Sequence, residues 1–115
     1  MQRDKAISIK ALSMLGLARR AGKLSMGHDM AEQAIIKHKA KLLLFCSDVS
    51  PRLISEFERT TKKHSIDIKM IKTDFLMEEI HFAIGYKAGV MTVDDKNFSN
   101  RIIDLLRQED NANGN

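Results

Sequence analysis

Residues 21–34 read A-G-K-L-S-M-G-H-D-M-A-E-Q-A, and this stretch constrains the fold and the function more than any other. It predicts a helix that stops at Gly22, a very short extended segment, a glycine at Gly27 and the start of a second helix. Unpaired amides at a helix N-terminus carry partial positive charge and suit an anion such as a phosphate. A glycine there lets another backbone come close. The pattern is typical of a nucleic-acid contact.

Basic side chains cluster beside this predicted contact. Arg19, Arg20 and Lys23 precede Gly27, and the segment 5–41 contains two acidic residues among its many cations. The whole chain carries a formal net charge of +4. Cations at a helix end also complement the helix dipole, which is one interpretation of these residues. Their density beside the glycine favours a second interpretation, a face that follows phosphates.

Working outward from this stretch, apolar spacing predicts helices and strands that alternate along the chain. We expect helices over about 4–21, 29–39, 50–64, 74–85 and 95–106, and strands over about 23–26, 41–46, 66–71 and 89–93. Ser50-Pro51 is a strong helix start, and Asp74 is expected to cap the next helix. The order α-β-α-β-α-β-α-β-α predicts one α/β domain over residues 1–107, with a small mixed four-stranded sheet between helix layers. The polar residues 108–115 are expected to form a disordered tail.

The motifs of common catalytic and metal sites are missing from the sequence. The four histidines show no metal-ligand spacing, and no nucleotide-binding glycine motif is present. Cys46 follows the apolar run 42–45, so we expect a buried thiol with a raised pKa and no reactivity. We therefore expect no enzyme activity, no cofactor, no metal and no small-molecule substrate. No apolar run approaches the ~20 residues of a membrane span, and no signal peptide is evident, so a cytoplasmic location without a membrane partner is expected.

The element order, together with L-G-L-A-R-R-A-G-K-L-x-x-G from Leu15 to Gly27, resembles a known family. This is the kink-turn-binding ribosomal-protein family typified by L-seven-Ae and L-thirty-e, and within it the small bacterial branch called YlxQ. The resemblance covers about residues 8–106. It implies a three-layer α/β/α sandwich that acts as a monomer and binds structured RNA, a kink-turn or a related bent internal loop, ribosomal RNA included. The alternative is a protein-interaction module, because the fold also serves relatives that bind proteins.

The resemblance further implies an RNA face made by the N-terminus of the second helix, the loop after the second strand and the loop before the fourth. Relatives that bind kink-turns carry G-[ST]-N-E at the first segment and a lysine four residues past the Asn. Here the matching positions are Gly27, His28, Asp29 and Met30, with Gln33 in place of the lysine, which predicts the same approach with a different specificity. The candidate RNA-binding residues are Arg19, Arg20, Lys23, Gly27, His28, Asp29, Met30, Gln33, Ser47, Asp48, Ile84, Gly85, Tyr86, Lys87 and Ala88.

Several of these residues have a second interpretation that needs no RNA. We expect the main role of Asp29 to be that of an N-cap, because it begins the D-x-x-E pattern of a capping box. His28 is either a protonatable phosphate contact or an exposed turn residue. Tyr86 either stacks on an unpaired base or packs back on its own domain. The basic runs 37–39 and 62–64 each close a predicted helix, so we expect them to flank RNA rather than read it.

Overall fold

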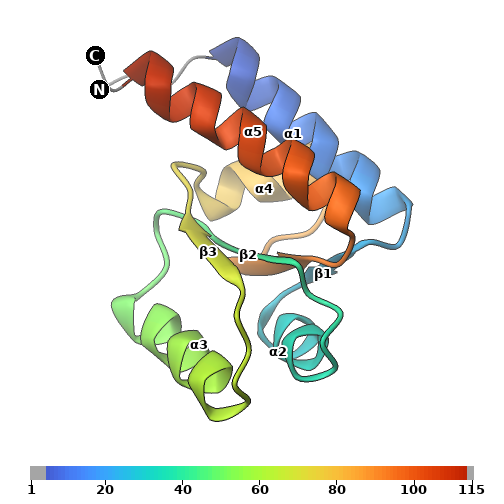
Figure 1. Cartoon of the computed structure of the whole chain (residues 1–115). Coiled ribbons are helices and arrows are strands. Elements are labelled where there is room, and N and C mark those ends of the chain that lie inside the picture. The colour runs from blue at the N-terminus through green and yellow to red at the C-terminus, as the bar shows by residue number, and fades with distance from the viewer. Residues whose placement is uncertain (1–4, 114–115) are drawn as a thin grey trace.

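The computed structural model describes residues 5–113, with side chains as far as residue 108. Helices and strands alternate along this part of the chain as the sequence predicts. They are α1 (Lys5–Arg20), β1 (Leu24–Met26), α2 (His28–Ile36), β2 (Leu42–Phe45), α3 (Pro51–Lys63), β3 (Lys69–Lys72), α4 (Met77–Ile84), β4 (Val90–Val93) and α5 (Lys96–Asn113). Helices α1, α4 and α5 cover one face of the sheet and α2 and α3 the other (Figure 1). The predicted three-layer α/β/α sandwich is confirmed.

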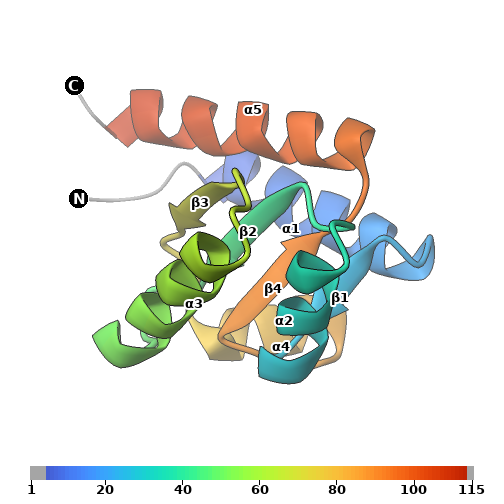
Figure 2. The ribbon, with the colours of Figure 1, turned by 60° about the horizontal axis from the view of Figure 1, so that its bottom comes forward.

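The sheet is mixed, with strand order β1-β4-β2-β3, as the view in Figure 2 shows. Strand β4 is antiparallel to both β1 and β2, whereas β2 and β3 are parallel. The two central strands are buried at every position. Because successive strand side chains point to opposite faces, Leu42 and Leu44 pack with the α1 layer while Leu43 and Phe45 pack with the α2 layer. The continuous apolar run of β2 therefore serves two cores.

Local signals at three helix ends act as predicted. Gly22 adopts φ 73° after α1, and the amide of Lys23 donates to the carbonyl of Ala18 at 2.8 Å, which closes a Schellman motif. Ser50 caps α3 by accepting a hydrogen bond from the amide of Leu53 at 3.2 Å. Gly85 ends α4 in the left-handed conformation with φ 88°. In the part of the chain that the structure describes, no helix has the length and hydrophobicity needed to cross a bilayer.

Several boundaries differ from the sequence prediction, among them the end of α2, which lies at Ile36 and not near residue 39. Asp74 does not cap α4, because the chain first buries Phe75, whose amide donates to Thr73 Oγ1, and the helix begins only at Met77. Strand β3 lies three residues later at its start than predicted, because its register is set by pairing with β2. Residues 108–113, for which we expected disorder, continue α5, since no glycine or proline interrupts the helix there. The last two residues of that predicted tail lie outside the described residues.

Candidate nucleic-acid interface

The N-terminus of α2 is open. Gly27 is its N-cap, with φ 90° and ψ 167°, and the glycine amide donates to the carbonyl of Val90 at 2.9 Å. Within the described residues, no acceptor meets the next three amides, those of His28, Asp29 and Met30. The prediction that Asp29 caps the helix is wrong. Strand β1 ends at Met26 and leaves one residue for the cap, so Asp29 lies inside the first turn with its side chain 97% exposed.

Arg19, Tyr86 and Gly27 bring three segments together at this helix end. Arg19 Nη1 donates to the carbonyl of Ile84 at 2.7 Å, and its guanidinium lies 5.4 Å from the centroid of the Tyr86 ring. A Cβ placed on Gly27 would lie 3.8 Å from the Tyr86 hydroxyl oxygen. The end of α1, the start of α2 and the loop after α4 are therefore in contact. Tyr86 packs on its own domain and still exposes 46% of its surface.

The turn at Ser47-Asp48 lies beside the same loop, but its polar groups serve the fold. Asp48 Oδ1 accepts a hydrogen bond from the amide of Met77 at 3.0 Å and so caps α4. Ser47 Oγ donates to the carbonyl of Phe75 at 3.2 Å. A Cβ on Gly89 would lie 2.5 Å from Val49 Cγ1, so the two loops touch where only glycine fits. Both predicted residues hold the segment that leads into α4 in place.

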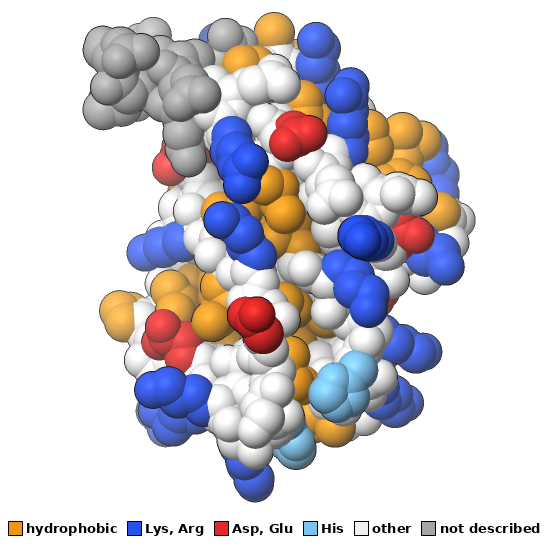
Figure 3. Space-filling view, in the orientation of Figure 1, with side chains coloured by type: hydrophobic (Ala, Val, Ile, Leu, Met, Phe, Trp, Pro, Cys, Tyr) orange, Lys and Arg blue, Asp and Glu red, His pale blue; other side chains and the backbone are white. Residues whose placement is uncertain are grey.

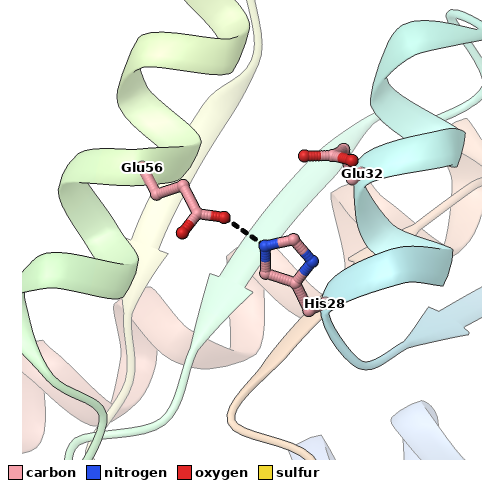
Figure 4. A group of neighbouring side chains, drawn as sticks. All are labelled: His28, Glu32 and Glu56. Carbon is pink, nitrogen blue, oxygen red and sulfur yellow. Dashed lines mark hydrogen bonds and ion pairs between the residues drawn. The ribbon is translucent and has the colours of Figure 1, made fainter.

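His28 faces α3 (Figure 4). Its Nε2 is hydrogen-bonded to the Glu56 carboxylate and its Nδ1 lies 3.0 Å from Asp29 Oδ1. The ring also packs edge-on against Phe57, with centroids 5.3 Å apart. The hydrogen bond to Glu56 is the largest cause of the raised pKa of His28, and the hydrogen bond to Asp29 is the second. In return, the hydrogen bond to His28 lowers the pKa of Glu56. The hydrogen bond between His28 and Glu56 thus joins α2 to α3, and we call this pair the clasp. The sequence did not predict this role of His28, because Glu56 comes from α3.

Two further groups of titratable side chains could in principle support chemistry, a possible cation site and a cysteine thiol. His28, Glu32 and Glu56 offer ligand atoms within 4.8 Å of one another, a set that could hold a cation. The imidazole in that set is already hydrogen-bonded through both ring nitrogens. Cys46 is a buried free thiol, and burial raises its pKa to about 12, in agreement with the predicted burial and the predicted direction of the pKa.

The remaining candidate residues divide between two grooves and the loop before β4. Lys23, Met30 and Gln33 line a groove between β1 and α2 with a volume of about 540 Å³. Arg20 lines another groove, between α1 and α4. In the loop, Lys87 is paired with Glu78 at 3.2 Å and Ala88 is buried. The predicted face therefore has one compact centre, the contact of Arg19, Tyr86 and Gly27, and several outlying members.

The first groove also contains Lys37 and Lys39, which the sequence placed only as flanking cations, and Lys41, which it placed at the start of a strand. Lys37, Lys39 and Lys41 line it together with Lys23. Figure 3 shows Lys and Arg side chains along the side of the molecule that carries α2. Met30, Gln33 and Lys37 are spaced by three and four residues, which places them on one helix face, and this spacing is the signal in the sequence that could have identified the groove.

Comparisons with known proteins show what this chain resembles in sequence and in fold. The chain is 32% identical over 98 residues to the RNA-binding protein YlxQ of Bacillus subtilis (strain 168), which covers 81% of this chain and 91% of that protein. A solved structure of a protein with unknown function from Bacillus halodurans C superposes with a TM-score of 0.71 at 26% identity, over 85% of this chain and 97% of the other.

Two further matches extend over most of the domain. The Giardia lamblia 15.5kD RNA binding protein has a TM-score of 0.63 at 12% identity, over 93% of this chain and 90% of its own, and shows the same fold. The model of the ribosomal protein L7Ae/L30e/S12e/Gadd45 family matches residues 10–99. This match spans the open helix end and the loop that carries Tyr86. The chain therefore belongs to the ribosomal protein L7Ae/L30e/S12e/Gadd45 family.

Proposed function

We propose that this chain is a non-enzymatic RNA-binding protein whose target is a structured RNA with a bend, a kink-turn or a related internal loop, ribosomal RNA included. The observation that carries the proposal is the contact of Tyr86, whose ring lies under Arg19, with the open N-terminus of α2 at Gly27. It places free amides, a cation and an exposed aromatic ring within one small area. The name of the Bacillus subtilis relative, an RNA-binding protein, supports the same conclusion.

Each group at this centre has a distinct task in the proposed complex. The amides of His28 to Met30 hold a phosphate or a base edge, and Gly27 permits the close approach. The exposed part of Tyr86 stacks on an unpaired base, while Arg19 covers the ring and fixes the loop. Arg20 and Lys23 neutralise backbone phosphates. Lys87 reaches RNA only after releasing Glu78.

Asp29 sets the expected specificity. Its carboxylate is exposed and can accept hydrogen bonds from the amino and imino groups of a guanine, but it cannot donate to an acceptor on a base. Met30 offers no hydrogen bond to a base edge. We therefore propose an RNA whose bend presents donors at this position. We further propose that the protein acts as a monomer. We also propose a cytoplasmic location, which the free thiol of Cys46 supports because thiols stay reduced there.

The test is a titration of the purified protein with a kink-turn RNA and with a hairpin that lacks the bend, at two salt concentrations. Selective, salt-sensitive binding of the kink-turn RNA supports the proposal. Equal binding of both RNAs would replace the bent target with a general affinity for phosphate backbone. Binding of neither RNA would overturn RNA binding as the function.

A second candidate function is a protein-interaction module, and one observation favours it. The groove between α1 and α4 carries exposed apolar side chains: Phe82 is 95% exposed, Ile9 63% and Leu17 45%. Apolar surface of this kind often marks a contact with another protein. Two results together would favour this function. The protein would bind neither RNA, and it would retain a partner after nuclease treatment that the Phe82→Lys variant does not bind.

A further inference from the structure

Four lysines line the groove between β1 and α2. Lys23 comes from the turn before β1, Lys37 ends α2, and Lys39 and Lys41 lie in the connection to β2. All four side chains are exposed. Helix dipoles account for Lys37, at the C-terminus of α2, and for Lys23, just after α1, but not for Lys39 and Lys41, which lie beyond the last turn of α2. Such a concentration of positive charge within one groove needs another explanation.

The positive charge of this groove is not neutralised by the protein. Within the described residues, none of the four ammonium groups forms an ion pair with a carboxylate. Asp94, the acidic residue of the lining, is held by the hydroxyl groups of Ser25 at 2.5 Å and Thr92 at 2.8 Å. Lys41 Nζ makes one long contact, 3.4 Å to the carbonyl of His38. Mutual repulsion of unpaired cations is relieved when a polyanion binds.

The groove begins where the proposed RNA contact ends. Met30, Gln33 and Lys37 follow one another along one face of α2, from its open N-terminus to the lysines. The nine residues of α2 span ~13 Å at 1.5 Å per residue. Met30 is 61% exposed and gives this path an apolar surface against which a ribose can lie. A nucleic-acid strand that leaves the helix end can therefore continue into the groove without a turn.

We propose that the groove of Lys23, Lys37, Lys39 and Lys41 holds the phosphate backbone of the RNA strand that flanks the bend. This inference rests on the proposed function and adds to it the second half of the RNA footprint. The lysines are flexible point charges, and they contact phosphates without reading bases. The groove therefore contributes affinity and salt dependence, while sequence discrimination stays at the α2 N-terminus.

The test compares two triple variants with equal loss of charge. The first, Lys37→Ala/Lys39→Ala/Lys41→Ala, removes three of the four cations from the groove. The control, Lys62→Ala/Lys63→Ala/Lys69→Ala, removes three exposed lysines from α3 and β3, and β3 is the edge of the sheet opposite β1. Circular dichroism melts first establish that both variants fold. Binding of a fluorescent kink-turn RNA with long flanking stems is then measured by anisotropy over a range of salt concentrations.

We expect the groove variant to reduce the slope of log Kd against log salt by roughly 2 to 3, because each phosphate that is no longer neutralised changes the slope by ~0.7–0.9. The control should keep its slope within about 1 of the wild-type slope. The same RNA with its stems trimmed should bind the groove variant and wild type alike. Equal slopes for the two variants would overturn the groove inference while leaving RNA binding in place. A wild-type protein that binds no RNA would overturn the proposed function and the groove with it.

Discussion

The Nε2 atom of His28 and the carboxylate of Glu56 are hydrogen-bonded to each other and join the start of α2 to α3 on one face of the sheet. This contact lies one residue from Gly27, so it helps to fix the helix end that we assign to RNA. The hydrogen bond between them raises the pKa of His28 and lowers the pKa of Glu56. The strength of the clasp therefore depends on pH.

The pKa of His28 is raised from 6.5, so its contribution to stability is complete below pH 6.5 and is lost as pH rises through the folded-state value. The pKa of Glu56 is lowered from 4.5, so its contribution is complete above pH 4.5 and is lost as pH falls through the folded-state value. The clasp should be strongest between pH 4.5 and pH 6.5. The variant Glu56→Gln should therefore lose most stability relative to wild type inside this window.

Urea unfolding of wild type and Glu56→Gln at several pH values measures this difference. The control is Glu58→Gln, an exposed carboxylate of the same helix that does not contact His28. If the difference in the free energy of unfolding between wild type and Glu56→Gln stayed constant with pH, the charges of His28 and Glu56 would not contribute to stability.

The helix ends show which parts of the fold can be predicted from sequence. Gly22, Ser50 and Gly85 act through their own backbone or side chain within a few residues, so local sequence is sufficient to identify them. Asp29 and Asp74 carry equally good cap signals, and both predictions fail. The first fails because β1 ends at Met26, and the second because burial of Phe75 delays α4. Tertiary pairing and packing decide these two cases.

The candidate interface shows the same division. The glycine, the arginines and the loop tyrosine are identifiable from the sequence, and the structure brings Arg19, Gly27 and Tyr86 into contact. Glu56 could not be assigned to His28, because 28 residues separate them and only the packing of α3 beside α2 joins them. The lysine groove is likewise made by the turn before β1 and the connection after α2, which meet only in the folded chain.

Replacement by alanine should change the free energy of unfolding in opposite directions at Gly27 and at Gly16. Gly27→Ala places a side chain at φ 90°, which should cost ~1–2 kcal/mol of stability. Gly16→Ala lies within α1 with no atom within 4 Å of the added methyl group, and it should stabilise by ~0.5–1 kcal/mol. Urea unfolding measures both. If Gly27→Ala left the free energy of unfolding unchanged or raised it, the positive φ of Gly27 at the N-cap of α2 would be wrong.

Tyr86→Leu should weaken the binding of kink-turn RNA by a factor of roughly 5 to 150, the equivalent of ~1–3 kcal/mol for one base stacked on an aromatic ring. Stability should change little, because the side chain is 46% exposed. Phe82→Leu is the matched control, since Phe82 is an even more exposed aromatic that lies within α4 and lines the groove between α1 and α4. Fluorescence anisotropy measures the affinities. Equal affinities for the two variants would remove Tyr86 from the RNA contact.

Asp29 is the residue at which a single change should strengthen RNA binding. Asp29→Asn replaces an acceptor-only carboxylate with an amide that both donates and accepts, and it removes a negative charge from the vicinity of phosphates. The side chain is 97% exposed, so the change should not disturb the fold. We expect affinity for kink-turn RNA to rise about tenfold, which corresponds to ~1.4 kcal/mol.

Asp29→Leu separates the two causes, because it removes the charge without adding a donor. If the amide reads a base edge, Asp29→Asn should bind the kink-turn RNA more tightly than Asp29→Leu, and the two variants should bind a plain hairpin alike. If the two variants bind the kink-turn RNA equally, repulsion by the carboxylate alone limits binding. If neither variant binds more tightly than wild type, residue 29 does not face the RNA. Asp29 is also hydrogen-bonded to His28 Nδ1, and this contact raises the pKa of His28, so both variants should lower that pKa.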